Sequence, residues 1–135
     1  MIAGQRGWEA PVWSEKRESD ACFERLTRRL VDARDSVRPA IATHNLRSLA
    51  HAIAYHEQRG GTPAELELQV LRGLGDELAE GVARLGYRVR IYTPIGDLVA
   101  GMAYLVRRLL ENSSNEGFLL RQRHQSLDEL LEAPA

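Results

Sequence analysis

Two short segments decide the fold of this chain: Leu66-Glu67-Leu68-Gln69-Val70-Leu71 and Arg88-Val89-Arg90-Ile91-Tyr92. In both, apolar side chains recur at every second position, which is the period of a β-strand. One side of the two segments carries Leu66, Leu68, Val70, Val89 and Ile91. The opposite side carries Glu67, Gln69, Leu71, Arg88, Arg90 and Tyr92. We therefore predict two strands, each with one apolar face, whose reverse is acidic on the first strand and basic on the second.

Helical patterns alternate with these strands and with two further extended segments, Pro11–Lys16 and Pro39–Thr43. Such alternation is typical of βα units and predicts a parallel sheet. Helices normally cover both faces of an open parallel sheet, so both faces are apolar. Because one face here is charged, the pattern favours a barrel with helices outside and a polar interior. An antiparallel sheet with one solvated face would alternate in the same way, but the intervening helices argue against it.

The sequence also marks where the helices begin and end. Ser19 and Asp20 offer N-cap oxygens to a first helix, and Asn45 offers one to a second. The first helix carries Phe23, Leu26 and Leu30 at helical spacing. Gly60-Gly61 is predicted to end the second helix. A third helix is predicted over Asp76–Leu85, ended by Gly86, and a short tail helix over Leu127–Glu132.

Composition limits the classes of function. The 135 residues suffice for one domain, and a net charge of −1 argues against nucleic acid, which requires a basic excess. Cys22 is the only cysteine, so neither a disulfide framework nor a cysteine metal site is expected. No apolar run reaches the roughly 18 residues of a membrane span, and the N-terminus has no hydrophobic signal core. We expect a cytoplasmic protein without a metal site.

The segment Ala103-Tyr104-Leu105-Val106-Arg107-Arg108-Leu109-Leu110-Glu111-Asn112 predicts a helix that is apolar except at two arginines and a glutamate. Adjacent helical side chains point about 100° apart, so the two guanidiniums can approach one anion from two sides. Glu111 lies close enough along the helix to brace either arginine. Forked guanidiniums suit a carboxylate or a phosphate. The alternatives are a surface helix with an ordinary ion pair, or a small α/β anion-binding module.

Motifs along the whole chain follow the order and spacing of one family. Besides the strands above, they are Arg6-Gly7-Trp8, Glu15-Lys16, Glu18-Ser19-Asp20, Phe23-Glu24-Arg25-Leu26-Thr27-Arg28, Ala42-Thr43-His44-Asn45-Leu46-Arg47-Ser48-Leu49-Ala50, Thr93-Pro94, the arginine-bearing decapeptide and Asn115-Glu116-Gly117-Phe118-Leu119. Together they resemble the second half of the proline dehydrogenase barrel, above all in the bifunctional proline dehydrogenase/glutamate-semialdehyde dehydrogenases of the proline utilization A group. The resemblance implies an α/β fold, a partial (β/α)8 TIM barrel of about four C-terminal βα units. It places the arginine pair on the last helix, with residues 1–125 in the half barrel and 126–135 in a tail.

The resemblance implies a FAD-dependent oxidoreductase of proline catabolism, which converts L-proline to pyrroline-5-carboxylate by hydride transfer to FAD and passes the electrons to a quinone. It implies a cytoplasmic location, with a peripheral position at the inner membrane as the alternative. A complete barrel takes roughly 250 residues. We therefore expect a fragment that is active only with a complementing chain or as a homo-oligomer. The alternative is a non-catalytic remnant or interaction domain that keeps the fold without binding flavin.

The resemblance also implies roles for individual residues in catalysis. Arg107 and Arg108 match the pair that holds the substrate carboxylate, and Glu111 would orient them. Tyr92 matches the tyrosine packed against the proline ring, and Leu71 matches a further wall of the pocket. Holding a carboxylate while the ring lies near the flavin is most of what a protein adds to this chemistry.

The cofactor contacts implied by the resemblance are Thr43, His44, Asn45, Gln69 and, near the adenine end of FAD, Lys16 and Ser14. Taken alone, His44 has the alternative of a helix-start histidine bonded to backbone, and Gln69 that of a satisfied polar group inside the barrel. The charged residues of the two quoted strands are interpreted as an interior ion network that shapes the barrel: Glu67, Arg88 and Arg90.

Overall fold

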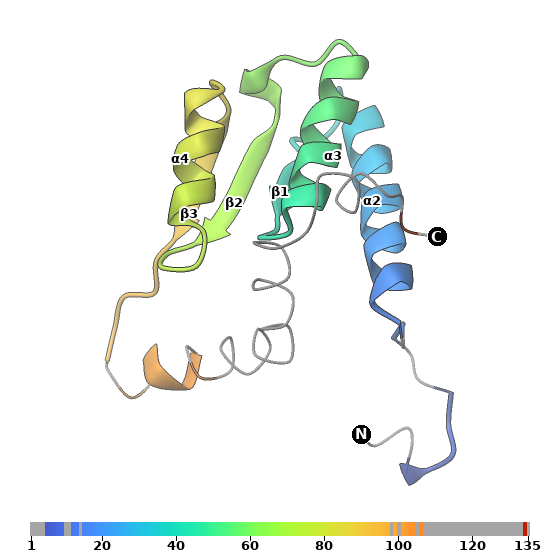
Figure 1. Cartoon of the computed structure of the whole chain (residues 1–135), viewed down its shortest axis with the longest axis vertical. Coiled ribbons are helices and arrows are strands. Elements are labelled where there is room, and N and C mark those ends of the chain that lie inside the picture. Colours follow the sequence, from blue (N-terminus) through green and yellow to red (C-terminus); the bar gives the residue numbers. More distant parts are fainter. Residues whose placement is uncertain are drawn as a thin grey trace.

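The computed structural model describes residues 5–9, 12–13, 15–97, 99, 101–104, 106 and 134 of the chain. The helices and strands of the sheet region follow in this order along the chain (Figure 1): α2 (Lys16–Asp32), β1 (Ala40–Ala42), α3 (Leu46–Gln58), β2 (Glu67–Leu71), α4 (Asp76–Arg84) and β3 (Arg88–Tyr92). A short 3-10 helix, η1 (Pro63–Glu65), precedes β2.

The three strands form one parallel sheet in the order β1-β2-β3. Glu67 at the start of β2 pairs with Ala40 on one side and with Arg88 on the other, and Leu71 at its end pairs with Tyr92. Helices α3 and α4 cover one face of this sheet, and α2 lies beside α3 (Figure 1). The prediction of βα units with a parallel sheet is therefore confirmed for the described part of the chain, which holds three strands.

The core lies between the sheet and these helices. It consists of Ile41, Leu49, Ala52, Leu66, Leu68, Val82 and Tyr87, each at most 5% exposed. Leu66 and Leu68 are both 1% exposed, which confirms the predicted apolar face of β2. Burying one such side chain contributes about 1.5–3 kcal/mol, so this face is the main source of stability.

The predicted ends of the second and third helices are confirmed. The Asn45 Oδ1 atom accepts hydrogen bonds from the backbone N–H groups of Arg47 at 3.0 Å and Ser48 at 3.4 Å, which caps α3. Gly60 and Gly86 follow α3 and α4 with φ of +73° and +87°. Glycine adopts this left-handed conformation without strain and so ends a helix.

The prediction for the start of the first helix is wrong. Helix α2 begins at Lys16 and its N-cap residue is Glu15, four residues before the predicted cap at Ser19. The described part of the predicted strand Pro11–Lys16 contains no strand. The physical reason is local, because the Glu18 carboxylate accepts a hydrogen bond from the Glu15 backbone N–H at 3.4 Å and starts the helix earlier.

Helix α2 buries only part of its predicted apolar face. Leu26 and Leu30 are 49% and 43% exposed, and Phe23 is only partly buried. The buried positions of the helix are Glu24, Thr27 and Val31. A glutamate can occupy this interface because α3 supplies basic partners for it.

Several predictions concern parts of the chain outside the described residues. They are the arginine pair Arg107 and Arg108 with Glu111, the cofactor contact Ser14, and the tail helix Leu127–Glu132. Residues 101–104 and 106, which lead toward the arginine pair, are helical as predicted. None of the helices among the described residues is long and apolar enough to cross a membrane.

Candidate active site

The carboxyl ends of the three strands bring most of the predicted site residues to one edge of the sheet. Thr43, His44 and Asn45 follow β1, and Leu71 and Tyr92 are the last residues of β2 and β3. Parallel pairing places Leu71 directly beside Tyr92. We call this group, together with Gln69 two residues before the end of β2, the carboxyl edge.

His44 connects the turn after β1 to the end of β2. Its Nε2 atom accepts a hydrogen bond from the Leu71 backbone N–H at 2.9 Å. The last backbone hydrogen bond between the two segments runs from the Thr43 N–H to the Gln69 carbonyl at 3.3 Å. The next contact along β2 is the one made by the His44 imidazole. An accepting Nε2 requires the neutral ring with its proton on Nδ1. Burial lowers the pKa of His44, which favours the same neutral state.

Gly75, a site residue that the sequence did not indicate, makes this arrangement of His44 possible. A Cβ atom at Gly75 would lie 2.9 Å from His44 Cδ2 and 2.9 Å from Val70 Cβ. Gly75 is also the N-cap residue of α4, so the helix starts directly against the imidazole. The pair Gly73 and Gly75 after a strand was a visible signal, but it has no phosphate-loop pattern that would have assigned it a role.

Thr43 and Asn45 shape the turn between β1 and α3. The Thr43 hydroxyl oxygen accepts a hydrogen bond from the Asn45 N–H at 3.0 Å, and Asn45 caps the helix. The side chains of the predicted Thr43-His44-Asn45 motif thus each hold a backbone N–H of this edge in place. This fits the structural alternative for His44, and a flavin contact at the same residue stays a prediction.

The polar face of the sheet carries the predicted ion network. Arg90 donates to both carboxylate oxygens of Glu67, at 2.7 and 2.8 Å, and the Gln69 amide donates to Glu67 Oε1 at 2.7 Å. The guanidinium of Arg90, followed by the Gln69 amide, lowers the pKa of Glu67 to about 2. Arg88 pairs in register with Glu67 and lowers the same pKa through its charge. The ion pair of Glu67 with Arg90 is confirmed, whereas its place in a barrel interior stays a prediction. Gln69 has the contact of a satisfied polar group.

Tyr92 faces the segment that leads to the arginine pair. Its side chain is half exposed, and its ring lies 5.6 Å from the ring of Tyr104, centre to centre, at an angle of 42°. Tyr104 therefore places the helical residues 101–104 near the end of β3. It is a second site residue that the sequence did not indicate, because only the fold brings the two rings together.

A pocket lies at the opposite end of the strands. This pocket, of about 850 Å³, opens at their amino ends and is lined by residues 34–40, 64–65 and the first residues of β2 and β3. It is therefore separate from the carboxyl edge, where Leu71 and Tyr92 end their strands.

Comparison with known proteins decides the family. A model of the proline dehydrogenase family matches residues 1–121. The chain belongs to the proline dehydrogenase family. The bifunctional protein PutA of Salmonella typhimurium is 36% identical over 142 residues, which cover 99% of this chain and 10% of that protein. Proline dehydrogenase 1 of Bacillus subtilis is 28% identical over 112 residues, covering 83% of this chain and 36% of that protein.

A solved structure supports the same family. The crystal structure of proline utilization A (PutA) from Bdellovibrio bacteriovorus, inactivated by N-propargylglycine, matches with a TM-score of 0.90 and 44% identity. The match covers 99% of this chain and 14% of that one. The chain thus spans about a tenth of the length of the Salmonella PutA protein that it matches.

The structure places six of the predicted site residues at the carboxyl edge: Thr43, His44, Asn45, Gln69, Leu71 and Tyr92. Lys16 differs, because it lies in the first turn of α2, where its Nζ atom bonds Asp20 at 2.5 Å. It is therefore a helical residue and not a residue of the predicted strand. Arg107, Arg108, Glu111 and Ser14 lie outside the described residues.

Proposed function

We propose that the chain forms the second half of a FAD-dependent proline dehydrogenase barrel, and that the completed barrel oxidises L-proline to pyrroline-5-carboxylate by hydride transfer. The observation that supports this is the convergence of Leu71, Tyr92 and His44 on one edge of a parallel sheet in a member of this family. The carboxyl edge is where barrels of βα units bind their substrates.

The residues of this edge fit a flavin cofactor. Thr43, Asn45 and Gln69 are uncharged hydrogen-bonding side chains, and His44 is neutral because its Nε2 accepts from backbone. Such groups can contact the polar atoms of a flavin without placing a charge beside its ring. We assign FAD to these four residues, with Lys16 and Ser14 toward the adenine end. When bound, FAD supplies the hydride acceptor for the reaction.

The substrate assignment follows from the same edge. Leu71 and Tyr92 are neighbours in register and offer an apolar wall to the proline ring. We assign the substrate carboxylate to Arg107 and Arg108, which Glu111 orients. Gripping proline by its carboxylate and by its ring fixes the one orientation in which hydride transfer can occur.

The polar face of the sheet supports completion by further polypeptide. Arg88 and Arg90 are exposed on β3, and β1 and β3 are the outer strands of the described sheet. Unpaired strand edges promote association. We propose that a complementing chain segment, or a second copy, covers this face. We also propose a quinone as electron acceptor, and a cytoplasmic location with peripheral contact to the inner membrane.

Exchange into a complete relative tests the proposal. The 135 residues would replace the matching segment of full-length Bdellovibrio PutA, to which they are 44% identical. We expect the chimera to keep the absorbance of bound flavin and proline-dependent dye reduction, and to be inactivated by N-propargylglycine. A folded chimera that holds no flavin would favour the alternative of a remnant or interaction domain.

Two substitutions in the chimera test the carboxylate role. Arg107→Met and Arg108→Met each remove a charged, forked donor, so we expect the KM for proline to rise at least about tenfold. Flavin content should stay unchanged, since neither residue is assigned to FAD. Arg84→Met is the matched control, because this arginine pairs with Glu80 on the surface of α4. Ordinary proline kinetics in both variants would rule out the assignment.

A further inference from the structure

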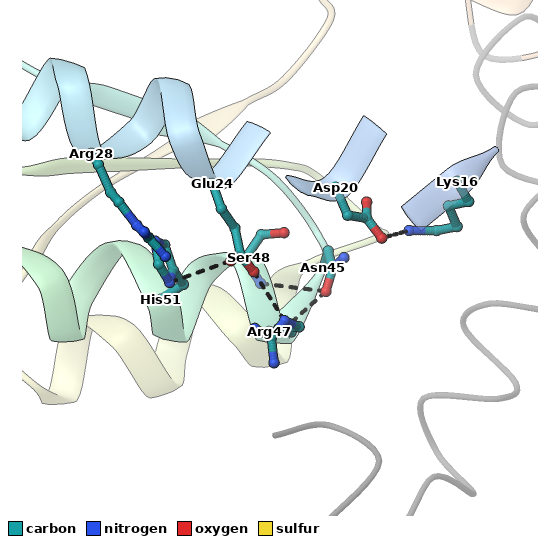
Figure 2. Close-up of polar contacts among 8 residues, drawn as sticks. All are labelled: Lys16, Asp20, Glu24, Arg28, Asn45, Arg47, Ser48 and His51. Carbon is teal, nitrogen blue, oxygen red and sulfur yellow. Dashed lines mark hydrogen bonds and ion pairs between the residues drawn. The ribbon is translucent and has the colours of Figure 1, made fainter. Parts of the chain in front are cut away.

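A buried carboxylate lies behind the carboxyl edge, at the seam between α2 and α3. Glu24 of α2 is 4% exposed, whereas Leu26 and Leu30 of the same helix are 49% and 43% exposed. Its Oε1 accepts a hydrogen bond from Arg47 Nε at 2.9 Å, and its Oε2 lies 3.6 Å from His51 Nδ1 (Figure 2). A buried carboxylate is tolerated only when its charge is paired, and the Arg47 guanidinium supplies the opposite charge.

Arg47 leads from this carboxylate to the turn that carries the predicted cofactor contacts. It is the second residue of α3, and its backbone N–H donates to Asn45 Oδ1 while its side chain is held by Glu24 (Figure 2). Asn45 follows His44, whose ring accepts from the Leu71 N–H. Glu24 is therefore connected to the end of β2 by an unbroken series of short contacts.

His51 and Arg28 close the other side of the carboxylate. Arg28 Nε donates to His51 Nε2 at 3.1 Å, so the histidine lies between a guanidinium and the carboxylate (Figure 2). The charged groups that face His51 are Glu24 and Arg28 from α2 and Arg47 from α3, with Tyr55 stacked on its ring. The contacts of His51 with Glu24 and Arg28 connect α3 to α2, whereas the stacking of Tyr55 on His51 lies within α3.

We propose that Glu24 is a positioning residue, which holds the Thr43-His44-Asn45 turn against the end of β2 through its ion pair with Arg47. Among the described residues, the other contacts of the turn come from Thr43, His44 and Asn45 themselves, so the ion pair is what ties it to α2. A fixed turn presents the three side chains in one geometry to the bound cofactor. The consequence for FAD rests on the proposed function, whereas the consequence for the turn itself does not.

The first experiment measures amide hydrogen exchange by NMR in the 135-residue chain. In Glu24→Gln the ion pair is lost, and we expect exchange to become at least about tenfold faster at Arg47, Ser48 and Leu71. Amides of α4 such as that of Val82 should not change. The matched control is Glu80→Gln, which removes a surface ion pair of α4 with a distance of 2.6 Å. Unchanged exchange at Leu71 in Glu24→Gln would overturn the proposal.

A double-mutant cycle separates positioning from general loss of stability. Glu24→Gln and Arg47→Gln should accelerate exchange at Leu71 by similar factors, and the double variant should add little to either. Additive effects would show that Glu24 acts on the turn by another route, and would overturn the proposal. If Glu24→Gln does not fold, Arg47→Gln alone still tests the link.

The second experiment uses the PutA chimera. Glu24→Gln should weaken FAD binding about tenfold and leave the KM for proline unchanged in the flavin-loaded enzyme, a split that a merely destabilised fold does not produce. Glu24→Asp should restore part of the affinity. If no version of the chimera binds flavin, the proposed function fails while the exchange data still decide the role of Glu24. If flavin binding is unaffected while exchange at Leu71 accelerates, the role in cofactor positioning is overturned.

Discussion

Leu68 and Gln69 are neighbours on β2 and lie on opposite faces of the sheet, in surroundings that differ in kind. Leu68 is 1% exposed in the core between the sheet and its helices. Gln69 is half-buried on the polar face, where its amide donates to Glu67. Residues of this chain close the first face over β2, whereas Ile91 on β3 is 39% exposed. On the second, in the part of the chain that the structure describes, Glu67 and Arg90 neutralise each other and no helix covers them.

This difference indicates that the apolar face of the sheet provides most of its stability, while the polar face provides the geometry of the proposed site. The apolar face gains its free energy from burial, which no further polypeptide has to supply. Ion pairs with one exposed partner contribute little, so the polar face adds geometry more than stability. Arg90 and Gln69 fix the carboxylate of Glu67, and the side chains of the carboxyl edge extend from the same strands. A sheet built in this way can fold on one face and leave the other to a ligand or to a partner.

The largest expected effect on the free energy of unfolding comes from a substitution on the apolar face. Leu68→Ala removes a fully buried side chain, and we expect the free energy of unfolding to fall by about 2–5 kcal/mol. Gln69→Ala, one position along on the other face, should cost less than about 1 kcal/mol. Urea denaturation of the 135-residue chain measures both values. Equal losses would show that the polar face carries as much stability as the core.

A second, smaller effect concerns the contact between the carboxyl edge and α4. Gly75→Ala forces a Cβ atom against His44 and Val70, and overpacking of this kind costs about 1–3 kcal/mol. Gly81→Ala is the matched control, because Gly81 lies in the interior of α4 with nothing within 4 Å of a new Cβ. Alanine is the better helix former, so this control should gain up to about 1 kcal/mol. The signs of the two changes in urea denaturation are opposite if the imidazole is packed as described.

Features that depend on interactions between residues close in sequence could be predicted, and those that depend on distant residues could not. The bounds of β3, the apolar face of β2 and the cap at Asn45 depend on residues within a few positions, and all were predicted correctly. The contact of His44 with Leu71 joins residues 27 positions apart, and no local pattern contains it. Family resemblance indicated His44 as a site residue, and the alternative of a bond to backbone did not indicate Leu71 as the partner.

The buried face of α2 shows why the rest could not be predicted. Helical spacing identified Phe23, Leu26 and Leu30 as its apolar residues, yet the helix buries Glu24. A carboxylate belongs inside only if basic partners meet it there, and Arg47 and His51 come from the next helix. The composition of one helix cannot reveal what a second helix will supply. The exposed Leu26 and Leu30 are consistent with the proposed further polypeptide packing on α2.

The smallest expected effect is a change in how the free energy of unfolding depends on pH, caused by Glu67 on the polar face. Arg90 lowers the pKa of Glu67 from 4.5 to about 2, so the unfolded chain binds a proton at Glu67 before the folded chain does. The contribution of Glu67 to stability is therefore complete above about pH 4.5 and is lost as the pH falls toward 2. Glu67→Gln removes this contribution, and urea denaturation between pH 2 and 5 should show a flatter pH dependence than in the parent chain. Glu80→Gln, at a surface pair of α4, should keep the parental slope in this window. Identical slopes in Glu67→Gln and the parent would mean that solvent screens the pair with Arg90, whose side chain is 68% exposed, and that the polar face is held by packing instead.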